Sequence, residues 1–216
     1  MPKLFVFSDV ICPWCYLGKR RLEQALDTLA LSDTVSVQWL PFELNPDMPP
    51  EGMPRAEYRA RKFGAARATE LDAHMEALGQ EEGVAFAFDR MERTPSTRRA
   101  HMLIAHAGRR GRGEAVVEAL FRTYFEEGRD VGDVAVLREI ARAGGLDETE
   151  AMAALESPEL EAEVVALERR AAEIGIGGVP FFVLEDGRAV SGAQSSETWR
   201  ELLAPMAALK RTDAGA

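Results

Sequence analysis

The apolar residues near the N-terminus follow first a strand pattern and then a helix pattern. Lys3–Phe7 is a short, apolar, β-prone run, which predicts a buried strand. From Trp14 onward, large apolar residues recur at intervals of three and four positions, as in a helix with one buried face. The run VSVQWLPFEL, residues 35–44, predicts a second strand. Pro41 places that strand at a sheet edge or at a strand end, because proline has no N–H to donate. These residues predict a β-α-β unit.

The middle of the chain is predicted to be mainly helical. The proline-rich stretch NPDMPPEGMP, residues 45–54, indicates a connector. The residues after it are helix formers interrupted by glycine, and no fixed repeat period relates them, which argues against a solenoid. The predicted helices are Ala56–Leu78, Thr97–Gly108, Glu114–Glu127, Val134–Ala143, Glu148–Leu155 and Pro158–Ile174. The run VAFAFDR, residues 84–90, is predicted to be an extended link.

The C-terminal part of the chain returns to a strand pattern. Residues 179–193, VPFFVLEDGRAVSGA, contain two short β-prone runs around Asp186-Gly187, a dipeptide favoured in tight hairpins. A last helix is predicted at Glu197–Leu209, where large apolar residues share one face. The chain therefore ends in a β-β-α unit.

The order of these elements predicts a discontinuous domain. A chain of 216 residues fits one large domain, or one domain with a sizeable insertion. If the helical block is set aside, the two ends form one compact α/β unit. We therefore predict an α/β fold in which residues 1–49 and 175–216 form one domain and residues 50–174 form an inserted helical domain.

The charge and the termini narrow the class of protein. A formal net charge of -10 disfavours a nucleic-acid binder, which would be basic, and disfavours docking on anionic lipid. The N-terminal residues do not have the pattern of a secretory leader, and no apolar run is long enough to span a bilayer. We therefore expect a cytoplasmic protein that binds neither nucleic acid nor membrane.

The candidate chemistry lies in the only two cysteines, Cys12 and Cys15, which could form a metal clip, a structural disulfide or a redox pair. Structural zinc needs four ligands, and C-x-x-C supplies half of them. His101 and His106 complete a Cys2His2 set on paper. They lie far from the cysteines, however, and point about 140° apart on a helix. A structural disulfide that closes a two-residue gap removes little entropy from the unfolded chain.

The redox reading uses both the position and the spacing of the cysteines. Cys12 lies where the strand ends and the helix begins, so unpaired N–H groups and the helix dipole favour its thiolate. Pro13 suits the first turn of a helix, where its missing N–H costs nothing. We expect Cys12 to be the acidic, exposed nucleophile and Cys15, one turn later, to be the shielded thiol that resolves a mixed disulfide.

The motifs SDVICPWCYLGKRRLE, GIGGVPFFV and VSGAQSSE resemble the DsbA-like thioredoxin-fold family, and within it the FrnE-type branch. The resemblance covers nearly the whole chain and implies a thioredoxin-like fold with a large all-helical insertion. It also implies a cis peptide bond at Val179-Pro180 beside the two sulfurs. The chain has STRRAH where the family tends to have N-T-x-x-A-H, so serine replaces asparagine five positions before His101.

This resemblance implies a thiol–disulfide oxidoreductase that needs no metal or organic cofactor. Cys12 and Cys15 would be catalytic, and the substrate-binding residues would be Pro13, Trp14, Val179, Pro180 and His101. We expect His101 to face the active-site groove, with its helix in the wall opposite Val179. The partners would be protein or small-molecule disulfides and thiols, glutathione among them. A homodimer is also an expectation, because apolar surface on the helical insertion could form a dimer interface.

The resemblance leaves two alternatives to the oxidoreductase: a glutathione-binding enzyme class and a binding module without catalytic activity. The kappa-class glutathione transferases and the 2-hydroxychromene-2-carboxylate isomerases have a similar architecture, but they generally use serine near the cysteine position and bind glutathione. A non-catalytic binding module on this fold is a third class. Since both Cys12 and Cys15 are present, the sequence favours the oxidoreductase over either alternative.

Overall fold

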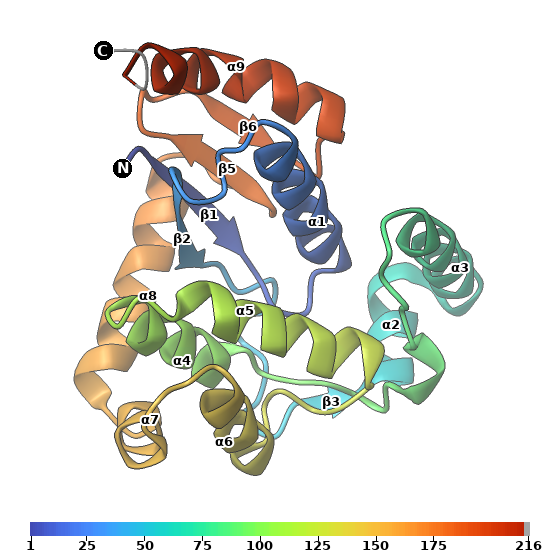
Figure 1. Ribbon diagram of the computed structural model, residues 1–216. Helices are drawn as coiled ribbons and strands as arrows, with labels where there is room; N and C mark the ends of the chain where they lie inside the picture. The colour runs from blue at the N-terminus through green and yellow to red at the C-terminus, as the bar shows by residue number, and fades with distance from the viewer. Residues whose placement is uncertain (214–216) are drawn as a thin grey trace.

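A four-stranded mixed sheet lies between two layers of helices (Figure 1). The computed structural model describes residues 1–213, and the side chains of residues 1–207. The strand order is β2-β1-β5-β6. The strands are β1 (Lys3–Ser8), β2 (Ser36–Pro41), β5 (Phe181–Leu184) and β6 (Ala189–Ser191). The strand β1 pairs in parallel with β2 and antiparallel with β5, and β5 pairs antiparallel with β6. The predicted edge position of the second strand is confirmed, since β2 lies at the edge and ends at Pro41.

Alternate residues of the central strands serve the two faces of the sheet, as strand geometry requires. Leu4 and Phe182 pack with the helices α1 (Pro13–Thr28) and α9 (Ser196–Asp213). Phe7 lies on the opposite face, in contact with a cluster that includes Ala171 of α8 (Pro158–Glu173). The sheet is therefore covered on both faces, and α1 begins after a short loop that follows the end of the inner strand β1.

The helical segment between β2 and β5 agrees with the predicted pattern in most of its elements. Besides α8, its helices are α2 (Arg55–Phe63), α3 (Ala65–Glu81), α4 (Arg98–Gly108), α5 (Gly113–Phe121), α6 (Val134–Ala143) and α7 (Glu148–Leu155). The predicted bounds of α6 and α7 are confirmed. Both helices begin after an aspartate whose side chain accepts a hydrogen bond from a backbone N–H of the first turn. Local capping thus fixes where these two helices start.

Other predicted elements differ from the structure. The single helix expected at Ala56–Leu78 is wrong, because Gly64 has φ 79° and divides it into α2 and α3. The helix expected to end at Glu127 changes at Arg122–Glu126 into a short π-helix. The predicted extended link ends in a 3-10 turn at Phe88–Arg90. Two very short strands, β3 (Met53–Pro54) and β4 (Arg93–Thr94), pair beside it and were not predicted.

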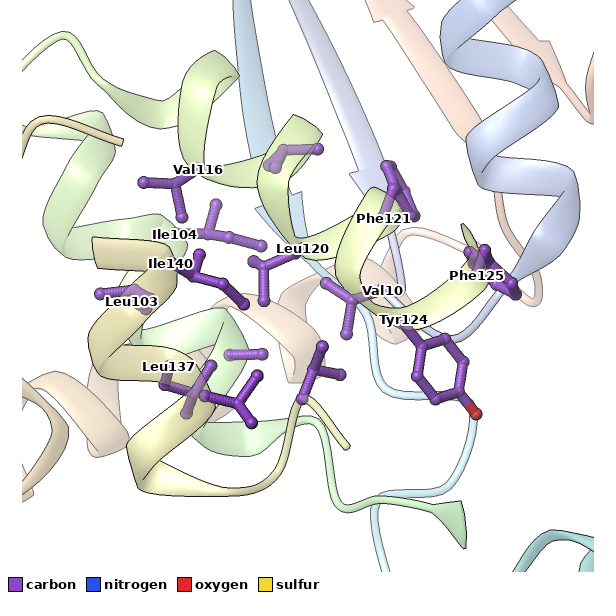
Figure 2. Close-up of a cluster of buried hydrophobic side chains, with 14 of the residues drawn as sticks. Val10, Leu103, Ile104, Val116, Leu120, Phe121, Tyr124, Phe125, Leu137 and Ile140 are labelled. Atoms are coloured by element: carbon purple, nitrogen blue, oxygen red, sulfur yellow. The ribbon is translucent and has the colours of Figure 1, made fainter. Parts of the chain in front are cut away.

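A buried apolar core joins the helical segment to α1 (Figure 2). Phe121 and Phe125 lie at the side of this core that faces α1. Tyr16 of α1 stacks on Phe121 with ring centroids 5.0 Å apart, and Phe86 meets Phe125 edge to face at 5.4 Å. Aromatic packing therefore anchors the helix that carries the cysteines against the inserted helices.

The division into residues 1–49 with 175–216 and residues 50–174 stays an interpretation. The core described above contains residues from both sides of that division. Among residues 1–213, no helix combines the length and the apolar character that crossing a bilayer requires.

Candidate active site

The two cysteines lie at the N-terminus of α1. Cys12 is the residue before the helix, and Pro13 is its first residue. The Cys12 N–H donates to the Asp9 carbonyl at 3.0 Å, and the Cys15 N–H donates to the Cys12 carbonyl at 3.0 Å. These bonds form because the chain turns sharply from β1 into α1. Both cysteines are free thiols at the positive end of a helix.

The Val179-Pro180 peptide bond is cis, which confirms that prediction. The Cys12 thiol donates to the Val179 carbonyl, with sulfur and oxygen 3.6 Å apart. Pro180 lies against α1 at Gly18, where an added Cβ would be 3.1 Å from the proline Cγ. The segment before β5 therefore reaches the start of α1, so residues distant in the sequence meet at the Cys12 sulfur.

Both thiols are more buried than the sequence suggests. Cys12 is 4% exposed and Cys15 is 1% exposed, so the expectation of an exposed Cys12 is wrong. Both belong to the apolar core that the inserted helices form against α1. Burial raises the pKa of the Cys15 thiol, and the neighbouring Cys12 raises it further. Hydrogen bonds from the Ser8 side chain and the Asp9 backbone oppose that rise without overcoming it.

A cavity of about 330 Å³ opens beside Cys12. Cys12, Pro13, Trp14 and Val179 line it, whereas Cys15 and Pro180 do not. The remaining lining residues come from the start of α1, the segment after β2, the helices α2 and α3, and the aromatic residues that follow them. They are Ile11, Leu44, Arg55, Tyr58, Arg59, Lys62, Phe63, Leu71, Asp72, His74, Met75, Phe88, Met91, Thr94, Tyr124 and Phe125. A substrate that reaches the Cys12 sulfur by this route must enter a chamber built largely by the insertion.

The charged residues of this cavity are mainly cationic. Arg55 and Arg59 share one acidic partner, Asp72, at 2.8 Å and 2.5 Å. Lys62 donates to the Tyr58 hydroxyl at 2.6 Å and, among the side chains that the structure describes, pairs with no carboxylate. Three cations therefore face one carboxylate in a protein whose net charge is -10. The cavity is suited to an anionic ligand.

His101 does not face this cavity, which corrects the sequence-based expectation. The His101 side chain, on α4, is 2% exposed, and its Nε2 lies 3.5 Å from Asp9 Oδ1. The walls opposite Val179 come from α2, α3 and the aromatic residues of the core, because α4 packs instead against α5, α7, α8 and β2. His101 therefore touches the loop that precedes the cysteines, and not the space where a substrate would lie.

Sequence reasoning missed the cationic residues that α2 brings to this cavity. Arg55, Arg59 and Lys62 are spaced four and three residues apart, which places them on one face of a helix. This spacing was visible in the sequence, although nothing in it indicates that this face lies beside Cys12. Within residues 1–213, no three His, Cys, Asp or Glu side chains are grouped so that they could hold a metal ion.

Comparison with known proteins shows the family to which the chain belongs. Residues 3–204 match the family described as the DSBA-like thioredoxin domain. The chain belongs to this family. It resembles the structure of a probable DsbA oxidoreductase from Streptomyces coelicolor, with 37% identity, a TM-score of 0.85, and coverage of 94% of this chain and 88% of the other.

Two further relatives show how widely the architecture is used. The protein YwbO of Bacillus subtilis (strain 168), described as uncharacterized, is 26% identical over 92% of this chain and 94% of its own length. The structure of a 2-hydroxychromene-2-carboxylate isomerase matches with a TM-score of 0.70 and 16% identity, over 99% of this chain and 98% of that chain. A 2-hydroxychromene-2-carboxylate isomerase therefore shares this fold, and the choice between that class and the oxidoreductase depends on the residues of the site.

Proposed function

We propose that the protein is a DsbA-like thiol–disulfide oxidoreductase, of the FrnE-type branch, in which Cys12 is the nucleophile and Cys15 the resolving thiol. One observation carries the proposal. A helix-terminal thiol pair has only its first member on a substrate-sized cavity, with the Val179 carbonyl 3.6 Å from that sulfur. This arrangement gives the two thiols different catalytic roles, because a ligand in the cavity can contact Cys12 but not Cys15.

The reaction is a pair of sulfur exchanges. The Cys12 thiolate attacks one sulfur of a substrate disulfide, forms a mixed disulfide, and releases the other sulfur as a thiolate that takes up a proton. Cys15 then loses its proton and attacks the Cys12 sulfur, which releases the second substrate thiol and leaves a Cys12–Cys15 disulfide. Two equivalents of an external thiol return the pair to the reduced state. The N–H groups at the start of α1 stabilise negative charge on Cys12 when it is the leaving group.

The raised pKa of Cys15 favours this order of events. Because burial and Cys12 keep Cys15 protonated, it does not compete with Cys12 for the incoming disulfide. Once Cys12 is in a mixed disulfide, its negative charge is gone. One cause of the raised pKa of Cys15 is then removed, and its deprotonation becomes easier.

The cavity favours disulfides of small, anionic thiols, and glutathione is one such thiol. Arg55, Arg59 and Lys62 would pair with substrate carboxylates, while Trp14 and Phe63 offer apolar contact near the opening. An extended strand of a protein substrate could also pair with the backbone at Val179, as in strand addition. The burial of Cys12 weighs against a large folded substrate and towards a small disulfide or a flexible peptide.

The remaining parts of the proposal concern the setting. The chain uses both of its cysteines at the active site and so has none for a structural disulfide, as is usual in a reducing compartment, and we place the protein in the cytoplasm. We also keep the prediction of a homodimer. A measurement of the molar mass of the protein in solution tests it.

The test compares three variants with two substrates. Cys12→Ser should abolish catalytic turnover of oxidised glutathione in the presence of a dithiol reductant. Cys15→Ser, treated with oxidised glutathione and no reductant, should stop at a mixed disulfide on Cys12 that mass spectrometry detects as one added glutathione, because no resolving thiol is left. Ser195→Ala, far from the cavity, is the matched control and should keep the wild-type rate. Oxidised glutathione should react faster than cystamine, a cationic disulfide of smaller size, because the cavity is cationic.

Several outcomes would contradict the proposal. If both cysteine variants kept full activity, the dithiol would not be the catalyst. Activity of the variants in glutathione conjugation or in 2-hydroxychromene-2-carboxylate isomerisation would instead favour the alternative class. A faster reaction with cystamine would overturn the substrate preference while leaving the oxidoreductase in place.

A further inference from the structure

A cluster of buried ionisable side chains lies behind the active-site loop and does not line the cavity beside Cys12. Asp9 comes from the loop between β1 and α1, and Glu43 comes from the segment after β2. Arg98 and His101 lie on α4, and Glu168 lies on α8. Asp9, Glu43 and His101 are buried, and the side chain of Glu168 is 15% exposed. Buried charges on four separate segments are costly unless they balance one another.

Asp9 connects this cluster to both cysteines through its backbone. Its carbonyl accepts the Cys12 N–H at 3.0 Å, and its backbone hydrogen-bonds the Cys15 thiol. Its carboxylate accepts the Leu44 N–H at 2.7 Å and lies 3.5 Å from His101 Nε2. Asp9 therefore ties the loop that holds the two cysteines to His101 and to the segment after β2.

The groups that face His101 indicate its charge. Burial by itself lowers the pKa of His101, but the adjacent Asp9 carboxylate, with the charges of Glu168 and Glu43, raises it overall. Arg98 pairs with Glu43 and lies 3.9 Å from Glu168. Burial and the neighbouring Glu43 raise the pKa of Glu168 to about 7. Arg98 and, when it is protonated, His101 offset the negative charges of the carboxylates in this cluster.

We propose that His101 is a positioning residue for the redox pair: its positive charge neutralises Asp9, the residue whose backbone holds both cysteines. Without that charge, the Asp9 carboxylate would disfavour a thiolate on Cys12 or Cys15 and would itself be a buried, unbalanced charge. This inference rests on the proposed function for its consequence in catalysis. Its own test measures protonation and thiol reactivity, and does not depend on any substrate being turned over.

The first measurement is an NMR titration of the histidine side chains in the wild-type protein. The chain has three histidines, so single variants of His74 and His106 assign the three imidazole signals. The pKa of His101 should lie above the ordinary histidine value of about 6.5. His106 lies on the same helix, but burial and Arg110 lower its pKa, so it should titrate at a lower pH than His101. A His101 pKa at or below the ordinary value would overturn the proposal.

The second measurement is the alkylation rate of Cys12 by iodoacetamide in a Cys15→Ser background. His101→Gln should lower the rate at pH 7 by roughly three- to tenfold, because an opposite charge near a thiolate is lost. His106→Gln is the matched control and should leave the rate unchanged. Adding Asp9→Asn to His101→Gln should restore most of the rate, because the charge that His101 balanced is then gone.

The double variant separates a charge role from a structural one. If His101 acts only by filling space, Asp9→Asn should add to the loss, since a second group in the same network is altered. An additive loss, or an unchanged rate in His101→Gln, would overturn the proposal. If His101→Gln fails to fold, the titration of the wild-type protein still decides the charge. Failure of the glutathione assay with these results intact would refute the proposed function alone.

Discussion

The raised pKa of Glu168 predicts how the stability of the protein depends on pH. Its carboxyl has a pKa of about 7 in the folded protein, because burial and Glu43 disfavour its ionised form. In the unfolded chain the pKa returns to the ordinary value near 4.5. Between these two values the folded protein holds a proton that the unfolded chain has released. The free energy of unfolding therefore falls as the pH rises from about 4.5 to about 7, and the stabilisation is absent above 7.

The size of this effect follows from the difference between the two pKa values. That difference corresponds to about 3 kcal/mol for one group, at about 1.4 kcal/mol per unit. Glu168→Gln resembles the protonated carboxyl at every pH. At pH 8 we expect the variant to be more stable than the wild type by up to about 3 kcal/mol, and near pH 4.5 we expect the two proteins to be equal. The raised pKa of His101 adds a stability loss in the same direction. Because the charge of Glu168 contributes to that raised pKa, the difference between the two proteins measures Glu168 together with its effect on His101.

Urea unfolding followed by circular dichroism at several values between pH 4.5 and pH 8 measures this difference. Glu173→Gln, an exposed position at the end of the same helix, is the matched control and should follow the wild type at every pH. A constant difference between Glu168→Gln and the wild type across the range would refute the reasoning. A variant that is less stable than the wild type at pH 8 would do the same.

Two further predictions concern packing, and thermal unfolding checks both. Phe121→Ala removes the ring that stacks on Tyr16 and should lower the free energy of unfolding by about 3–5 kcal/mol. The control Phe63→Ala, at an exposed position, should lower it by less than about 1 kcal/mol. Equal effects of the two variants would contradict the anchoring of α1 by the aromatic core. Gly128→Ala should cost roughly 1–3 kcal/mol because φ is +73° and the new Cβ would lie 2.6 Å from Arg90 Cβ. Gly177→Ala meets no atom within 4 Å and should change the stability by less than about 0.5 kcal/mol; a loss as large as that of Gly128→Ala would count against the strain argument.

The sequence predicted those elements of the fold whose ends carry their own local signals. The helix at Val134–Ala143 was located correctly because an aspartate precedes it and glycine follows it. The break at Gly64 was missed, since helix-forming residues continue on both sides and the pattern alone does not show that the backbone turns there. The short strands β3 and β4 each have only two residues, too few for any periodicity to appear.

Part of the active site could also be predicted from the sequence, because some of its residues belong to recognisable local motifs. Cys12, Cys15 and Val179-Pro180 belong to motifs, so their meeting could be predicted from a resemblance. The cavity could not, because its walls come from the approach of α2 and α3 to α1, and local sequence patterns do not specify that approach. His101 was associated with the site but assigned to the wrong side. Its partner Asp9 is distant in the sequence and gives no helical or strand pattern that would link the two.

The inserted helices meet the active-site loop with two separate sets of residues. The helix α2 brings cations to the cavity beside Cys12, where a ligand would lie. The helices α4 and α8 bring His101 and Glu168 to the cluster around Asp9, outside that cavity. If the two proposals hold, substrate preference and thiol reactivity are set by different helices of one insertion. Changes at Lys62 would then alter which disulfide binds and leave the alkylation rate of Cys12 as it is, and changes at His101 would alter that rate for every substrate alike.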